Sequence, residues 1–168
     1  MEGASIMEYI NNDKKFIQIL YSNKNTFTFS DLIDIIQNER KATNNINLSY
    51  WLILGDFLDW IYKKEKGNDN TDERKISVIF EKEPKFLKKY WQYWEIMFLA
   101  GTAERICEIM QWKKPMWIFK EKYYMKSGQD PYFSMNAKGA LRVVFLRESP
   151  MCYRKRGIFV SGNVLTRV

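Results

Sequence analysis

The 168-residue chain contains no histidine, and this absence excludes several kinds of catalytic and metal site. Without an imidazole there is no Ser-His-Asp triad, no Cys-His dyad and no zinc site of the HExxH type. Glycine and proline are scarce, with 8 and 4 residues, which excludes fibrous classes. The 11 Phe, 10 Tyr and 6 Trp are too many for a disordered chain. We therefore expect residues 1–168 to form a single globular domain.

Cysteines and long hydrophobic runs are equally scarce. Cys107 and Cys152 lie far apart in sequence and outside any CxxC pair, so we expect two free buried thiols, with a disulfide between them as the alternative. The longest apolar runs, such as 96–100, are far shorter than the roughly 20 residues of a spanning helix. The acidic N-terminus lacks the apolar stretch of a secretory signal. We expect a cytoplasmic protein with no membrane segment.

Positive charge is concentrated at one end of the chain. Residues 113–168 contain 12 Lys and Arg against 3 Asp and Glu, whereas residues 1–112 contain 15 against 17. Such an imbalance indicates that the basic third meets an anionic partner, either nucleic acid or an acidic protein. The alternative is that the basic third packs against the acidic residues of the same chain.

Hydrophobic periodicity predicts a mainly α fold, a compact helical domain with small β elements near the C-terminus. We expect N-terminal helices over 1–65, a flexible linker over 66–70, and a helical body over 71–168. The first three expected helices cover 5–21, 30–40 with Ser30 as N-cap, and 50–64. A further helix restarts at Thr71 or Asp72 and is ended by Pro84. The last two cover 85–111, with an interruption at Gly101, and 137–148.

The segment 137–148 is apolar nearly all round, which predicts a buried helix, although its Val143-Val144-Phe145 would also suit a strand. Residues 158–160 predict a short terminal strand. Gly157 is expected to cap a helix that ends just before it.

Carboxylates would have to carry any acid–base or metal chemistry in a chain without histidine. Asp56 and Asp59, three apart on a helix, could hold Mg²⁺, but their neighbours are packing residues and a solvated acidic face is favoured. Glu104 and Glu108 are four apart, and Glu104 is suited to pair with Arg105 or a lysine instead. No Walker A or GxGxxG loop is present. We expect no cofactor and no enzymatic activity; a metal enzyme at Asp56 and Asp59 is the least favoured hypothesis.

Two further patterns are weighed as nucleic-acid readers. The helix pair over 30–64 has a longer connector than a helix-turn-helix, and its second helix offers apolar side chains, so packing is favoured. The aromatic cluster Tyr90, Trp91, Tyr93 and Trp94 could stack bases, but its helical spacing favours core, with some members left to face a partner.

The strongest candidate binding site is the basic cluster near the C-terminus. Guanidinium groups are suited to bidentate contacts with phosphates and carboxylates. Either the cluster binds a partner or nucleic acid, or it is a solvated turn whose arginines pair with acids of the first two-thirds. The six candidate residues are Lys138, Arg142, Arg147, Arg154, Lys155 and Arg156.

Several short segments between residues 50 and 168 carry a family resemblance. They are Asp56-Phe57-Leu58, Glu83-Pro84, Pro115-Met116-Trp117, the segment from Glu148-Ser149-Pro150 through Ile158-Phe159-Val160, and the closing Leu165-Thr166-Arg167-Val168. In these segments the chain resembles a group of small, functionally uncharacterised bacterial proteins. The last twenty residues are the specific part of the pattern.

The resemblance implies a function in a two-gene module. Relatives are encoded beside nucleotidyltransferase-like genes, and some carry an Xre-type helix-turn-helix in front, which is similar to a toxin–antitoxin pair. The first 45 residues here lack a convincing Xre motif, so DNA autoregulation does not carry over. The resemblance implies a non-enzymatic, antitoxin-like protein that binds a cognate protein, with a nucleotidyltransferase-like toxin as the candidate. The alternative is a nucleic-acid-binding module or transcriptional regulator that uses the basic third.

Overall fold

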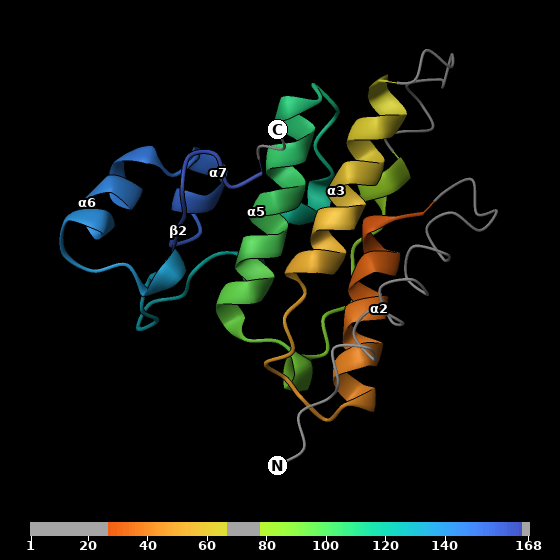
Figure 1. Ribbon diagram of the computed structural model, residues 1–168, viewed down its shortest axis with the longest axis horizontal. Helices are drawn as coiled ribbons and strands as arrows, with labels where there is room; N and C mark the ends of the chain where they lie inside the picture. Colours follow the sequence, from red (N-terminus) through yellow and green to blue (C-terminus); the bar gives the residue numbers. More distant parts are fainter. Residues whose placement is uncertain (1–26, 67–77, 166–168) are drawn as a thin grey trace.

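The computed structural model describes residues 27–66 and 78–165, and its fold is mainly α, as predicted. Figure 1 shows α2, α3 and α5 as the body, with α7, β2 and α6 to one side. The elements are α2 (Phe29–Ala42), α3 (Trp51–Lys66), η1 (Lys88–Tyr90), α5 (Tyr93–Ile109), η2 (Met116–Phe119), η3 (Glu121–Tyr123), β1 (Tyr132–Phe133), η4 (Ser134–Asn136), α6 (Gly139–Glu148), α7 (Met151–Arg154) and β2 (Ile158–Phe159).

Some predicted segments lie outside the described residues. These are the helix over 5–21, the linker after its first residue, and the helix start at Thr71 or Asp72. Lys66, the first linker residue, is the last residue of α3. Residues 78–81 are helical and precede Pro84, in agreement with the predicted stop.

The helix α2 begins at a capping box, in which the side chain of each of two residues accepts a hydrogen bond from the backbone N–H of the other. The Asp31 N–H donates to Thr28 Oγ1 at 3.2 Å, and the Thr28 N–H donates to Asp31 Oδ2 at 2.9 Å. Ser30 is therefore not the N-cap, and the prediction was wrong by two residues. Thr28 takes that position because it stands three residues before an acid, the spacing that a capping box requires.

Aromatic rings fill the space between α2, α3 and the turn around residue 80. The ring centroid of Phe29 lies 6.0 Å from that of Phe57 and 5.2 Å from that of Phe80. Leu54 and Leu58 of α3 are buried in the same core. Burial of such side chains is the main favourable term in folding.

The helix α5 starts later than predicted and is not interrupted. Residues 84–92 form extended backbone and the 3-10 turn η1, so the helix expected from 85 begins only at Tyr93. Gly101 lies inside the continuous helix, where a Cβ atom would stand 2.7 Å from Tyr153 Cδ1. The absence of a side chain at Gly101 is what lets α7 pack closely against α5.

A buried ion pair joins α2 to the start of α5. Arg40 Nη2 lies 2.7 Å from Glu95 Oε1, and both side chains are at most 5% exposed. The same guanidinium donates to the Leu48 carbonyl at 3.0 Å and stacks 4.6 Å from the Trp91 ring centroid. These contacts satisfy a charge that would otherwise be costly to bury.

The C-terminal part is organised around a small parallel sheet. β1 pairs with β2 in the register Tyr132 to Ile158 and Phe133 to Phe159. The predicted terminal strand is thus confirmed. The predicted helix cap at Gly157 was wrong, because α7 ends at Arg154 and its C-cap is Lys155. Gly157, with φ +72°, instead donates its N–H to the Arg154 carbonyl at 2.9 Å in the turn that leads into β2.

Both cysteines are free and buried, as expected. Burial raises the pKa of each thiol to about 12, at Cys107 and Cys152 alike. Among the described residues, no helix is both long enough and apolar enough to cross a bilayer.

Candidate partner-binding surface

The helix α6 is exposed, although its apolar sequence predicted burial. Of its ten residues only Phe145 is buried, whereas Val143 is 64% and Leu146 42% exposed. Figure 1 shows α6 at the edge of the molecule, with α7 and β2 between it and the helical body. The prediction of a buried helix was wrong because burial depends on where the chain places a helix, and hydrophobicity alone does not fix that place.

The C-terminal end of α6 is firmly attached to the strand β2. The Ser149 Oγ accepts the Val160 N–H at 2.7 Å and lies 2.8 Å from the Val160 carbonyl oxygen. Phe145, one turn earlier, is only 4% exposed. These contacts hold α6 at one end and leave most of its surface open.

One face of α6 points away from the body. At about 100° per residue, Ala140, Val143, Val144 and Arg147 share the face opposite Phe145. All four residues are exposed. Their spacing of i, i+3, i+4 and i+7 is that of a helix face that docks into a groove. We call these four residues the outer face of α6.

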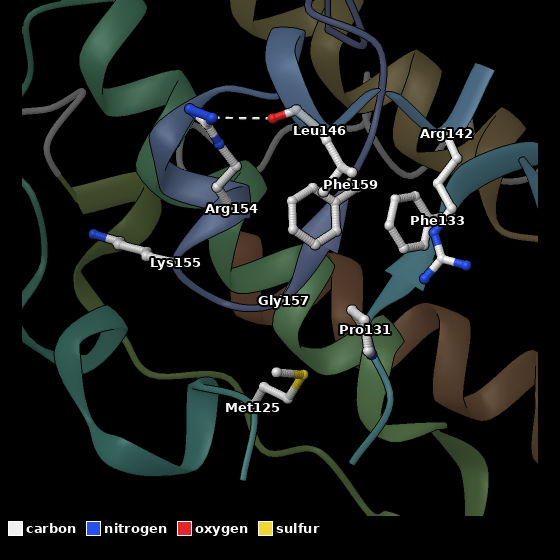
Figure 2. Close-up of a pocket in the computed structure, with 9 residues that line it drawn as sticks. All are labelled: Met125, Pro131, Phe133, Arg142, Leu146, Arg154, Lys155, Gly157 and Phe159. Atoms are coloured by element: carbon white, nitrogen blue, oxygen red, sulfur yellow. Dashed lines mark hydrogen bonds between the residues drawn. The ribbon is translucent and has the colours of Figure 1, made fainter. Parts of the chain in front are cut away.

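A cleft of about 370 Å³ lies on the other side of α6, between it and the two strands. Figure 2 shows the rings of Phe133 and Phe159 side by side at its centre, with centroids 4.8 Å apart and an interplanar angle of 14°. We call this cavity the α6 cleft. Its lining residues are Met125, Pro131, Phe133, Arg142, Leu146, Arg154, Lys155, Gly157 and Phe159.

Two arginines flank the rings of the α6 cleft. The guanidinium carbon of Arg142 lies 4.2 Å from the Phe133 ring centroid, a cation–π contact. Arg154 Nη2 donates to the Leu146 carbonyl at 3.0 Å, as the dashed line in Figure 2 marks. No ion pair among residues 27–66 and 78–165 involves either guanidinium.

The structure separates the six basic residues that the sequence singled out. Lys138 and Arg147 are exposed, at the N-cap of α6 and on its outer face. Arg142 and Arg154 line the α6 cleft, and Lys155 lines it as well. Four of the six, namely Lys138, Arg142, Arg147 and Arg154, have no ion pair within the described ranges.

Arg156 is fully buried and is therefore wrong as a binding residue. Its Nη1 lies 2.6 Å from Glu104 Oε2, and its Nη2 donates to the Ile118 carbonyl at 2.9 Å. Nη1 also donates to the Cys152 carbonyl. The positive charge belongs to the core, as the intramolecular alternative predicted, because Glu104 on α5 faces the turn after α7.

Glu104 is the centre of a charged network that also holds Lys155. Lys155 Nζ lies 2.7 Å and Lys114 Nζ 3.1 Å from Glu104 Oε1. Burial alone would raise the pKa of Glu104, but hydrogen bonds from Lys155, Arg156 and Lys114 outweigh it and hold that pKa below its ordinary value. The ammonium group of Lys155 is therefore bound to Glu104. Its aliphatic stem lines the α6 cleft, where its charge is partly neutralised.

The carboxylate pairs weighed as metal sites have other surroundings. Glu104 and Glu108 share Lys114, and Glu108 also pairs with Arg105 at 3.4 Å. The expected pairing of Glu104 with a lysine is confirmed, while Arg105 pairs with Glu108. Asp59 is exposed and Asp56 half-buried on α3. In the part of the chain that the structure describes, no group of three or more His, Cys, Asp or Glu could hold a metal ion.

The aromatic cluster before and at the start of α5 also contains both buried and more exposed residues. Tyr90 and Trp91 are buried in the core, at 9% and 6% exposed. Tyr93 is 40% exposed, and its hydroxyl donates to the Asp130 carbonyl at 2.9 Å. Trp94 stacks on Tyr132 with ring centroids 3.9 Å apart.

Sequence reasoning missed the aromatic centre of the α6 cleft. The sequence predicts Phe159 only as part of a strand and assigns no role to Phe133. The alternation of a strand does carry a signal, because Phe159 must face away from its neighbours Ile158 and Val160. Those two neighbours are 1% exposed, and Phe159 is half-buried.

Comparisons with known proteins give no match. No protein-family model matches the chain, and no significant match was found among the curated proteins or the solved structures.

Proposed function

We propose that the protein is a non-enzymatic binding partner of another protein, which docks on the outer face of α6. The observation that carries this proposal is a helix with six apolar side chains, of which only that of Phe145 is buried. Val143 is 64% exposed at the centre of the outer face. Contiguous exposed apolar surface of this kind marks interaction sites, because leaving it in water is unfavourable.

Exposed methionines flank α6 in the sequence. Met135 and Met151 precede and follow α6 in the sequence, and they are 78% and 66% exposed. Unbranched thioether side chains adapt to the shape of a partner and are frequent on binding surfaces. Both ends of α6 therefore carry residues suited to docking.

The charge of the surface defines the chemistry of the partner. Arg147 stands on the outer face among apolar residues, Lys138 and Arg142 lie elsewhere on the same helical segment, and no ion pair among the described residues neutralises any of the three. A second copy of this chain would bring the same positive charges together, which disfavours self-association through α6. The fitting partner offers an apolar groove rimmed by carboxylates.

The resemblance to toxin–antitoxin-like gene pairs supports an antitoxin-like role. It points to the product of the adjacent gene, a nucleotidyltransferase-like toxin, as the partner. Binding through α6 would then neutralise that toxin.

A nucleic-acid-binding module is the second candidate. The four basic residues without an ion pair in the described part of the chain favour it. The apolar side chains between them weigh against it, because surfaces that bind phosphates are largely polar and positively charged. Such binding would weaken steeply with salt, with a log–log slope of roughly −0.9 for each neutralised phosphate. Protein binding through apolar contacts has no such slope.

The decisive experiment measures binding of the purified product of the adjacent gene by calorimetry. Val143→Asp places a charge at the centre of the outer face, and we expect it to weaken binding by about 30-fold or more, as loss of an interface anchor does. Leu87→Asp is the matched control, an exposed leucine (52%) remote from α6 in sequence and outside its surface. Equal affinities for Val143→Asp and the parent protein would refute docking on α6.

A cellular test accompanies it. Expression of the adjacent gene alone should stop growth, and co-expression with the parent chain should restore it. Toxicity that continues on co-expression would exclude the antitoxin role.

A further inference from the structure

We infer that the α6 cleft binds an aromatic side chain of the partner that stands next to a carboxylate residue. The inference rests on the proposed function and adds the anchor that the partner supplies. It uses the side of α6 opposite the outer face, so a partner that holds α6 in a groove would contact both sides of the helix.

The positive charge of the cleft favours an anionic ligand. Of the nine lining residues, three are cationic and none carries a carboxylate. Arg142 and Arg154 make no ion pair within residues 27–66 and 78–165. Arg154 uses one N–H for the Leu146 carbonyl, and the rest of its guanidinium is open to a ligand. A carboxylate would complete charge-assisted hydrogen bonds with either arginine.

The apolar centre of the cleft favours an aromatic ring in the ligand. The stacked rings of Phe133 and Phe159 lie side by side at the centre of the lining, as Figure 2 shows. Leu146, Met125 and Pro131 extend that apolar lining. An aromatic side chain gains both burial and ring contacts in such a site.

A nucleotide would also supply a ring and a negative charge, but the lining favours a peptide. The cleft has no Ser, Thr, Asn, Gln or Tyr among its lining residues. Sugar hydroxyls and base edges are recognised through such polar groups, and a phenylalanine beside a glutamate needs none of them. Lys155, the third cation, is held by Glu104 and adds little charge for a phosphate.

The test uses a defined probe, the capped pentapeptide Gly-Glu-Phe-Glu-Gly, titrated into the full-length protein labelled with ¹⁵N. We expect saturable shifts of the amide signals of Phe133, Gly157 and Phe159. The neutral peptide Gly-Gln-Phe-Gln-Gly and the ring-less peptide Gly-Glu-Ala-Glu-Gly should each bind about tenfold more weakly or worse, because each lacks half of the recognition.

Two charge-removing variants separate the cleft from general charge. Arg142→Gln should weaken the binding of the pentapeptide by about tenfold, as loss of a charged hydrogen bond does. Lys113→Gln is the matched control, since it removes one positive charge from an exposed residue outside α6 and outside the cleft. It should leave the affinity for the pentapeptide within twofold.

The possible results divide clearly. No shift at the three amides, or equal affinity for the charged and the neutral peptide, would overturn the inference. Adenosine monophosphate binding there at least as tightly as the pentapeptide would overturn it in favour of a nucleotide. The proposed function fails by a different result, namely an unchanged affinity of Val143→Asp for the adjacent gene product.

Discussion

The basic residues of α6 and those of the turn after α7 belong to one positively charged segment, yet their environments are opposite. Arg156 is 0% exposed and held by Glu104, whereas Arg147 is exposed on the outer face of α6. Arg156 therefore contributes to the stability of the fold. Arg147 leaves the fold unaffected and is open to a partner. Net charge along a sequence therefore counts both kinds of residue together. Four predictions test this division.

The largest expected effect is on the turn after α7. Glu104→Gln would leave Arg156 buried without its carboxylate, and breaking a buried ion pair costs about 3–5 kcal/mol of unfolding free energy. Urea denaturation at neutral pH measures the loss. Glu108→Gln is the matched control, since its side chain is 31% exposed and its loss should cost at most about 1 kcal/mol. Equal losses in the two variants would contradict a central role for Glu104.

The same carboxylate predicts a pH dependence. Because the folded-state pKa of Glu104 is lowered from 4.5, its contribution is complete above that value and is lost as the pH falls through the folded pKa. The stability difference between the parent protein and Glu104→Gln should therefore shrink on acidification from pH 7 to pH 3. Glu83 is common to both proteins and cancels in this difference; burial raises its pKa, but hydrogen bonds from Lys120, Lys122 and Tyr123 lower it to about 2. A constant difference across this range would contradict the lowered pKa.

Gly157 lies between the buried turn after α7 and the open α6 cleft. Its substitution should lower the unfolding free energy by an intermediate amount. At φ +72° an L-residue is strained, and a Cβ atom there would stand 2.5 Å from Met125 Sδ. Gly157→Ala should cost about 1–2 kcal/mol of unfolding free energy. The control is Gly128→Ala, which shares a positive φ but meets nothing within 4 Å. A larger loss in Gly157→Ala than in the control isolates the cost of the contact with Met125; equal losses would show that Met125 moves aside freely.

The smallest effect on stability is expected on the outer face of α6. Val143→Asp and Arg147→Gln should each change the unfolding free energy by no more than about 0.5 kcal/mol, because exposed positions contribute little to folding. Thermal denaturation is sufficient to check this. A pronounced loss of stability in either variant would place the outer face in the core of the fold and remove the basis for docking there.

The sequence predicted the helical class, the positions of α2, α3 and α6, and the short strand at Ile158. These follow from periodicity, which is local. It did not predict that α6 is exposed, since its apolar residues are equally compatible with a core and with an interface. The same limit applies to Arg154, Lys155 and Arg156, which are adjacent in sequence and point in different directions. Arg156 is buried because Glu104, about 50 residues away, and the carbonyls of Cys152 and Ile118 surround its guanidinium, whereas Lys155 binds the same carboxylate from a partly exposed position.

The two native thiols have a practical consequence for studying α6. Cys107 and Cys152 are the chain's two cysteines, and both are buried with a pKa of about 12, so neither forms appreciable thiolate at neutral pH. A cysteine introduced at the exposed Ala140 would therefore be alkylated selectively by a maleimide dye, without removal of the native pair. Fluorescence of the purified, labelled protein would then report whether an added partner covers α6.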